Sequence, residues 1–284
     1  MNQDLTTLAK FKAWYNIPST STTDDDLLQG IIDSASGDIL AYLDRKSLFK
    51  NTYPEYKNGT GGQQMMLLQW PVLSVASVTV DGVPQTAAVQ PNTGYFIDTW
   101  DGWPPGRPQY VSFIGGMGAG YPLISPPVNG GGNVFTRGVK NVYINYTAGY
   151  AVQNEAGTIP TLPYQLTAAQ SAGRWAQDDG LTIAGVAGIA VTGTPVTGQY
   201  SVSSGVYTFA AADTGKAVLI NYSYVPKAIE QACNMLVGEQ YSYRQRIGQK
   251  SHTLGGQVTT SFDNSIVTPM IVKKLQPFMR MVPY

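Results

Sequence analysis

The spacing of apolar residues changes twice along this chain of 284 residues, and this change constrains the fold more than any other feature. Between residues 24 and 46 apolar side chains such as Leu28, Ile32 and Ile39 recur every three or four positions, the period of an amphipathic helix. From about residue 52 apolar and polar residues alternate, as they do in strands, and the helical period returns at residues 226–248. The sequence therefore predicts an α+β fold, with helices at both ends around an antiparallel β region.

Charges and prolines support the predicted helix ends. Consecutive aspartates at residues 24–26 stand where a cap and first turn favour negative charge, and Arg45 stands where the last turn favours positive charge. A shorter helix is expected at residues 5–15, ended by Pro18. Pro226 suits the first position of the C-terminal helix.

Short strands separated by turn residues are predicted through the middle of the chain. Asp81-Gly82 is a strong hairpin signal. A long loop is expected at residues 115–138, which are rich in Gly and Pro. The predicted strands include residues 65–69, 74–80, 95–97, 110–114 and 139–146.

A separate β module of small-sandwich type is expected at residues 151–225, where turns and short strands recur closely. Its segment KAVLINY, residues 216–222, matches KNVYINY, residues 140–146, at Lys, Val, Ile, Asn and Tyr. Two interpretations are open. The module is an insertion into a simpler helix–sheet–helix chain, or the two strands merely share a composition that favours strands.

The predicted organisation has five parts, and the last of them is an extended arm. Its apolar and basic tail is too irregular to cover its own apolar residues, such as Phe278 and Tyr284, so we expect it to find a partner surface. The parts are N-terminal helices (1–50), a β region with a long loop (51–150), an inserted β module (151–225), a C-terminal helix (226–248) and a C-terminal docking arm (249–284).

Catalytic and metal-binding patterns are missing from the sequence. With one histidine, His252, and one cysteine, Cys233, the chain lacks the residues for a histidine-rich or thiolate metal site. Cys233 lies on the apolar face of its predicted helix, as a small buried hydrophobe does. The aspartates at 24–26 lack the alternating spacing of a calcium loop. We expect no enzyme activity, no metal and no cofactor.

Charge and exposed aromatic residues point to protein contacts. Eighteen basic and eighteen acidic residues give a net charge of zero, which excludes a global positive field for nucleic acid. Trp100 and Trp103 flank a turn-rich segment and predict an exposed contact loop.

Several stretches, in this order and spacing, resemble the head-tail connector (adaptor) proteins of tailed bacteriophages. They cover both ends and the middle of the chain and contain no catalytic motif. The stretches are LTTLAKFKAWYNI followed by TDDDLLQGIIDSASGDILAYLDRKSL, then LLQWPVLSVASVTVDG, then INYTAGY, and last PKAIEQACNMLVGEQYSYRQRIG with its trailing arm.

The resemblance implies a structural virion protein. Such adaptors form a ring, commonly of twelve copies, that docks beneath the portal, extends the DNA channel and provides a platform for the tail or neck. Genomic DNA passes through without sequence-specific binding. The location implied is the head-tail interface of the virion, and the host cytoplasm during assembly.

In such proteins the C-terminal segment reaches the portal. The resemblance therefore implies portal or partner contacts for the apolar and basic residues of the arm. These are Phe262, Ile266, Met270, Lys273, Lys274, Leu275, Phe278, Arg280 and Tyr284.

Two other functions are compatible with parts of the sequence. One is a tail-tube or other phage β-structural protein, against which the predicted helices argue. The other is a carbohydrate-binding module that uses Trp100 and Trp103.

Overall fold

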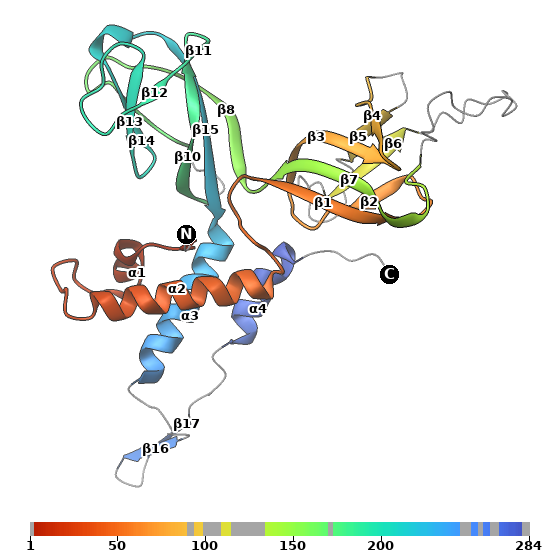
Figure 1. Cartoon of the computed structure of the whole chain (residues 1–284). Coiled ribbons are helices and arrows are strands. Elements are labelled where there is room, and N and C mark those ends of the chain that lie inside the picture. Colours follow the sequence, from red (N-terminus) through yellow and green to blue (C-terminus); the bar gives the residue numbers. More distant parts are fainter. Residues whose placement is uncertain are drawn as a thin grey trace, which may run out of the picture.

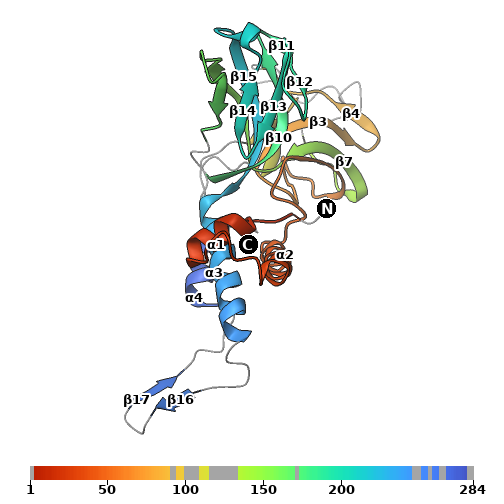
Figure 2. The ribbon, with the colours of Figure 1, turned by 90° about the vertical axis from the view of Figure 1, so that its left-hand side faces the viewer.

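The computed structural model describes residues 3–89, 94–98, 109–114, 134–169, 173–244, 251–254, 258–261 and 267–279. Within these residues the chain is α+β, as the changes of apolar spacing predict. Helices from both ends of the sequence form one layer, and two β units rise from the same side of it (Figure 1). A view at right angles again places both β units on that side (Figure 2). The helical layer is therefore their common base.

The helical layer encloses one apolar core. Phe11, Ile32 and Cys233 are fully buried in it, which agrees with the three helical stripes seen in the sequence. The first helix ends at Asn16, whose φ of 62° reverses the chain before Pro18. The helices are α1 (Leu8–Tyr15), α2 (Asp25–Tyr42), α3 (Lys227–Tyr243) and α4 (Pro269–Leu275).

Asp24 occupies the N-cap position of α2, but its side chain does not cap the helix. The carboxylate accepts a 2.6 Å hydrogen bond from the Tyr241 hydroxyl and lies 3.6 Å from the Arg244 guanidinium. The hydrogen bond from Tyr241 holds the pKa of Asp24 below its usual value. The residue predicted as a cap thus links the start of α2 to the end of α3.

The first β unit consists of two antiparallel sheets, with strand orders β1-β7-β3-β4 and β2-β6-β5. Val142, Ile144 and Tyr146 of its central strand are buried between them. The predicted hairpin is present, because Asp81 and Gly82 adopt φ values of 50° and 78°. The strands are β1 (Asn51–Gly59), β2 (Gln64–Met66), β3 (Val72–Val80), β4 (Val83–Gln85), β5 (Gly94–Asp98), β6 (Tyr110–Ile114) and β7 (Gly138–Ala148).

The second β unit has sheets of order β8-β15-β10-β11 and β9-β14-β13-β12, in which only the short β12–β13 pair is parallel among the described strands. Tyr200, Tyr207 and Tyr222 are buried between the sheets. The strands are β8 (Ala151–Thr158), β9 (Gln165–Thr167), β10 (Gly173–Ile183), β11 (Val186–Ala187), β12 (Ile189–Ala190), β13 (Gln199–Ser203), β14 (Val206–Phe209) and β15 (Ala217–Pro226).

Two strands from the arm lie apart from these units. β16 (Ser251–Leu254) and β17 (Val258–Ser261) pair as an antiparallel hairpin on the side of the helical layer opposite the β units (Figures 1 and 2).

One predicted strand is too long at its C-terminal end. Residues 65–69 alternate, yet β2 ends at Met66. The N–H groups of Leu68 and Gln69 donate to side chains, the Glu55 carboxylate and the Tyr146 hydroxyl, instead of to a neighbouring strand. Residues 115–133 of the predicted long loop lie outside the described residues.

Five residues join the helical layer, both β units and the arm, and we call them the junction. The Tyr224 N–H donates a 3.0 Å hydrogen bond to the Tyr150 carbonyl, and the two rings lie 6.0 Å apart. The Arg45 guanidinium lies over the rings of Trp70 and Tyr150, at 4.5 and 5.1 Å. The Phe278 ring is 6.2 Å from that of Tyr150.

Arg45 was expected to complement the dipole of the second helix, and the structure corrects this. The helix ends at Tyr42, and its last turn contains no basic residue. Asp44 adopts a φ of 53°, which turns the chain and directs the following residues inward. Arg45 is only 6% exposed and donates a hydrogen bond to the Trp70 carbonyl.

A buried carboxylate fixes the turn before β15. Asp213 accepts a 2.8 Å hydrogen bond from the Gly198 N–H and lies 2.7 Å from the Lys216 ammonium. Burial alone would raise the pKa of Asp213, but these two partners outweigh it and hold the pKa below the usual 3.8.

We expect Asp213→Asn to destabilise the second β unit, because it removes the negative charge that pairs with Lys216 and accepts the hydrogen bond from Gly198. The folded-state pKa is lowered, so the carboxylate contributes stability above its unfolded-state pKa and loses it as pH falls through the folded value. The variant should lose about 1–3 kcal/mol of unfolding free energy near neutral pH, and the difference from wild type should shrink below about pH 4.

Thermal unfolding followed by circular dichroism at several pH values measures this. Asp38→Asn, on the exposed side of α2, is the control and should change the free energy by less than about 0.5 kcal/mol. A loss for Asp213→Asn that stays constant down to pH 3 would contradict the assigned role.

Candidate partner-binding surfaces

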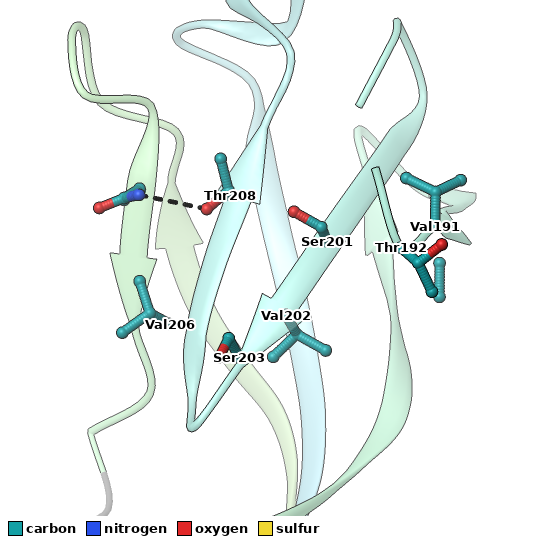
Figure 3. Close-up of a pocket in the computed structure, with 9 residues that line it drawn as sticks. Val191, Thr192, Ser201, Val202, Ser203, Val206 and Thr208 are labelled. Atoms are coloured by element: carbon teal, nitrogen blue, oxygen red, sulfur yellow. Dashed lines mark hydrogen bonds between the residues drawn. The ribbon is translucent and has the colours of Figure 1, made fainter. Parts of the chain in front are cut away.

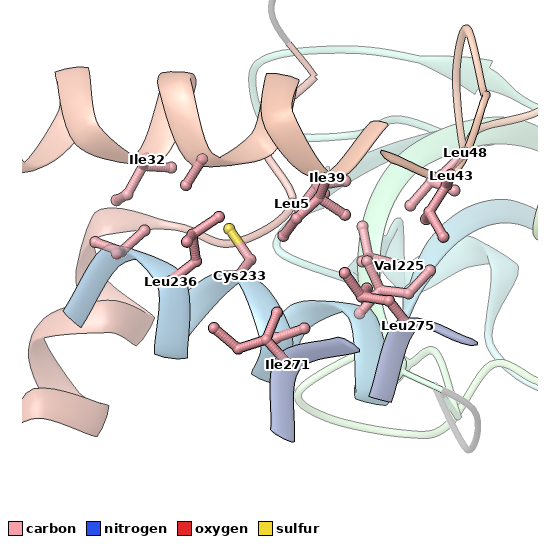
Figure 4. Packing of buried hydrophobic residues seen from close by; sticks show 14 of the residues in the cluster. Leu5, Ile32, Ile39, Leu43, Leu48, Val225, Cys233, Leu236, Ile271 and Leu275 are labelled. Atoms are coloured by element: carbon pink, nitrogen blue, oxygen red, sulfur yellow. The ribbon is translucent and has the colours of Figure 1, made fainter. Parts of the chain in front are cut away.

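One face of α4 is buried against the chain itself. Ile271 is 1% exposed and Leu275 is 2% exposed, and both belong to the core of the helical layer. Figure 4 shows Leu275 beside Val225 and Ile271 beside α3. The 3₁₀ turn that follows places Phe278 in the same core. The start of the arm is therefore anchored to the helical layer.

The other face of this segment is open. Met270 is 60% exposed, Val267 49% and Met279 38%. Lys273 lies on the exposed side, whereas the Lys274 ammonium donates a 3.0 Å hydrogen bond to the Gln231 amide oxygen on α3. Exposed methionines beside a lysine form a surface suited to an apolar partner with some negative charge.

The burial of the arm's side chains differs in part from what the sequence predicted. The expectation that the arm cannot cover its apolar residues is wrong for Phe278, because the chain's own helices and Tyr150 bury it. Leu275 is likewise occupied within the chain, whereas Met270 and Lys273 are available to a partner. The other predicted contact residues, Phe262, Ile266, Arg280, Tyr284, Trp100 and Trp103, lie outside the described residues.

Exposed apolar side chains on the N-terminal helices, Trp14 and Leu27 among them, escaped prediction. Trp14 on α1 is 50% exposed and Leu27 on α2 is 40% exposed. The edge of the Trp14 ring rests on α3 at Gly238, where a Cβ atom would come within 3.1 Å of the ring. The available signal was that Trp14 and Leu27 stand outside the apolar stripes of their helices.

Polar contacts between the helices hold these side chains in place. Lys12 is almost fully buried, forms an ion pair with Asp25 and donates a 2.7 Å hydrogen bond to the Ser21 carbonyl. Lys10 pairs with Glu230 of α3 at 3.0 Å. These contacts fix α1 against both longer helices.

An aromatic pair lies on the outer face of the first β unit. Tyr56 on β1 is 69% exposed, and its ring centroid is 4.8 Å from that of Tyr143 on β7. The Tyr143 side chain points outward because successive side chains of a strand face opposite sides, and its neighbours Val142 and Ile144 face the core.

The outer face of the second unit's smaller sheet is hollowed (Figure 3). The hollow has a volume of about 550 Å³, and its lining includes Gln165, Ser201, Val206 and Thr208. No ionisable side chain lines it among the described residues, so it offers no acid or base for catalysis.

Neither a metal site nor a membrane span is found in the part of the chain that the structure describes. No three His, Cys, Asp or Glu side chains there are grouped to hold a metal ion. None of the described helices is long and apolar enough to cross a membrane.

We expect Leu275→Ala to lower the free energy of unfolding by about 2–5 kcal/mol, because it leaves a cavity in the helical core. Met270→Ala, five residues earlier on the exposed face, should change it by less than about 0.5 kcal/mol. Urea denaturation followed by circular dichroism distinguishes the two. Equal, small losses in both variants would show that α4 is not anchored as described.

Comparison with known proteins gives a match to one family. Residues 5–66 match the family described as Phage gp6-like head-tail connector protein. This region includes α1, α2, β1 and β2, that is, half of the helical layer and the start of the first β unit. A search of curated proteins found no match. Residues 5–66 are therefore similar to the phage gp6-like head-tail connector family, and at the level of that family the match supports a structural protein of the virion.

Proposed function

We propose that this chain is a head-tail adaptor that forms a ring beneath the portal, extends the DNA channel and presents a platform to the tail or neck. The observation that carries the proposal is the family match at residues 5–66, which falls on the two N-terminal helices of the layer. The fold supports it, because α3 and α4 complete the same helical core. The location proposed is the head-tail interface of the virion, with assembly in the host cytoplasm.

Ring formation needs two different surfaces on each chain that fit one another. Head-to-tail contacts of this kind close into a ring when the rotation between neighbours allows it. Exposed apolar side chains occur both on the N-terminal helices, at Trp14 and Leu27, and on the outer face of the first β unit, at Tyr56. We propose these as the two complementary regions of a ring of twelve copies.

The portal contact is proposed for the arm. Its anchored face holds α4 in place, and its open face presents Met270 and Lys273. The remaining proposed contacts are Phe262, Ile266, Arg280 and Tyr284. Leu275 and Phe278 support this surface from behind rather than touch the partner, because they are buried in the chain.

The charge balance suits a channel through which DNA moves. Non-specific affinity for DNA comes mainly from cationic groups that replace counterions along the phosphates. With equal numbers of basic and acidic residues the chain carries no net positive charge to hold DNA. We therefore propose passage of the genome without sequence-specific binding.

Native mass spectrometry of the protein mixed with assembled portal from the same phage tests the proposal. We expect a discrete complex with one copy of this chain per portal subunit. The double variant Met270→Asp, Lys273→Glu should weaken the complex by about tenfold or more, because it replaces an apolar and a basic side chain of the exposed face by acidic ones.

Val186→Asp is the matched control, since Val186 is 71% exposed but lies on the second β unit. It should leave the complex unchanged. Absence of any complex between the wild-type chain and a competent portal ring overturns the adaptor proposal. Equal weakening by both variants overturns the placement of the contact on the arm.

A further inference from the structure

The two β units have the same strand topology. The first has sheets of order β1-β7-β3-β4 and β2-β6-β5, and the second has β8-β15-β10-β11 and β9-β14-β13-β12. One arrangement becomes the other when each strand is replaced by its counterpart. In chain order, β1, β2, β3 and β4 correspond to β8, β9, β10 and β11, and β5, β6 and β7 correspond to β13, β14 and β15. The additional β12 also has a counterpart, because Ala87 pairs with Tyr95 in parallel where β12 pairs with β13.

The pairing register agrees as well as the order. In the larger sheets, Val142 and Ile144 of β7 lie opposite Val80 and Val78 of β3. Val218 and Ile220 of β15 lie opposite Ile183 and Leu181 of β10 in the same way. A one-residue difference in register would place these apolar residues on opposite faces.

The hairpins that follow β3 and β10 are also equivalent. The first turns at Asp81 and Gly82, with φ values of 50° and 78°. The second turns at Ala184 and Gly185, with φ values of 50° and 82°. The N–H of the first turn residue donates to a carbonyl just before the central strand core in both units, that of Asn141 at 2.8 Å and that of Ala217 at 2.7 Å.

The smaller sheets match residue by residue. Gln64 pairs with Ser112 across β2 and β6, as Gln165 pairs with Thr208 across β9 and β14. Tyr95 pairs with Phe113 across β5 and β6, as Tyr200 pairs with Phe209 across β13 and β14. A shallow hollow lies on this outer face in each unit. Gln64 and Ser112 line that of the first unit, and Gln165 and Thr208 line that of the second, which Figure 3 shows.

A polar contact around a glutamate recurs at the same place in both units. The Tyr146 hydroxyl donates to Glu55, and the Leu68 N–H donates to the same carboxylate at 3.2 Å. The Tyr222 hydroxyl donates to Glu155 at 2.6 Å, and the Ala169 N–H donates to it at 2.8 Å. Each backbone donor is the second residue after β2 or β9. A shared preference for strand-forming residues does not produce this contact, because it joins three separate segments.

The first and last residues of the second β unit lie next to each other. Ala151 of β8 is the cross-strand partner of Ser223 of β15, and the next residues outward, Tyr150 and Tyr224, are hydrogen-bonded at 3.0 Å. The central strands of both units therefore end side by side at the junction. Removing the second unit would leave a gap that a two-residue turn closes.

We infer that the second β unit is an internal copy of the first, added to the adaptor chain at the junction, and that it is accessory to portal docking. The inference rests on the proposed function for its docking part only. The helical layer, the arm and the first β unit constitute the adaptor, and the second unit is an additional β unit mounted on it.

The surfaces of the two copies have diverged although their frameworks agree. Tyr56 and Tyr143, whose rings are in contact on the outer face of the first unit, occupy the positions of Ala156 and Leu219 in the second. Phe96, which lines the hollow of the first unit, occupies the position of Ser201. The second unit therefore lacks the aromatic contacts of the first and does not present a second site for the same partner.

Excision of the second unit tests the inference. Residues 152–222 are replaced by Asn-Gly, which joins the paired residues Ala151 and Ser223 through a two-residue hairpin turn. The matched variant replaces residues 53–146 by Asn-Gly between Thr52 and Thr147, the corresponding pair in the first unit. Each variant and the wild-type chain are mixed with assembled portal and measured by native mass spectrometry.

A second readout reports on the helical layer without any partner. Cys233 is the only cysteine of the chain and is fully buried in the helical core, so its reaction with a thiol reagent measures opening of that core. In the second-unit excision we expect the thiol to stay protected and the portal affinity to change by less than about threefold. The first-unit excision removes part of the family-matched region and should lose the portal complex.

The outcomes separate the inference from the proposed function. If the wild-type chain binds portal and the second-unit excision does not, although its thiol stays protected, the second unit takes part in docking and the inference is wrong. If the excision exposes Cys233, the helical core requires the second unit, and the unit is not accessory to the adaptor. If the wild-type chain itself does not bind portal, the adaptor proposal fails, while the thiol reaction still decides whether the second unit is separable.

Discussion

The rest of the structure depends on the packing around Tyr150. Its ring meets three partners that come from different parts of the chain: the guanidinium of Arg45 after α2, the ring of Tyr224 at the end of β15 and the ring of Phe278 in the arm. Its carbonyl accepts the hydrogen bond from Tyr224, which joins the end of β15 to the segment between β7 and β8. A cation placed over aromatic rings is favoured most where water is excluded, and Arg45 is almost fully buried. The helices, both β units and the arm are thus located relative to one another by one cluster.

Most of the helical layer could be predicted from local spacing, because a helix buries residues that are close in sequence. The start of the arm, at α4, is buried although the sequence did not predict it. Ile271, Leu275 and Phe278 stand at helical spacing, so the signal for one buried face was present, but the segment is short and lies between Pro269 and Pro277. The neighbouring surface on α3 that accepts them is more than thirty residues away in sequence, and single-sequence spacing does not reveal such a partner.

The β units show a different limit. Alternation identified many strands, but the pairing of a strand depends on residues distant in sequence. The similarity of KNVYINY and KAVLINY gave one link between the units and could not distinguish a copy from shared composition. Glu55 and Glu155 supply the missing information, since each reaches the last tyrosine of its segment from another strand. Arg45 is a similar case, because only the turn at Asp44 makes it a buried residue.

The attachment of the second β unit also has a mechanical consequence. Its two connecting strands, β8 and β15, run side by side and cross the junction at the same level. A force that pulls the unit away from the helices loads both covalent backbones in the same direction, so it neither unzips nor shears the hydrogen bonds between them. A third strand, β10, pairs with β15 as far as Pro226, and its Ala176 packs against the helical core. The base of the unit is therefore held on more than one side, so it resists tilting as well as stretching.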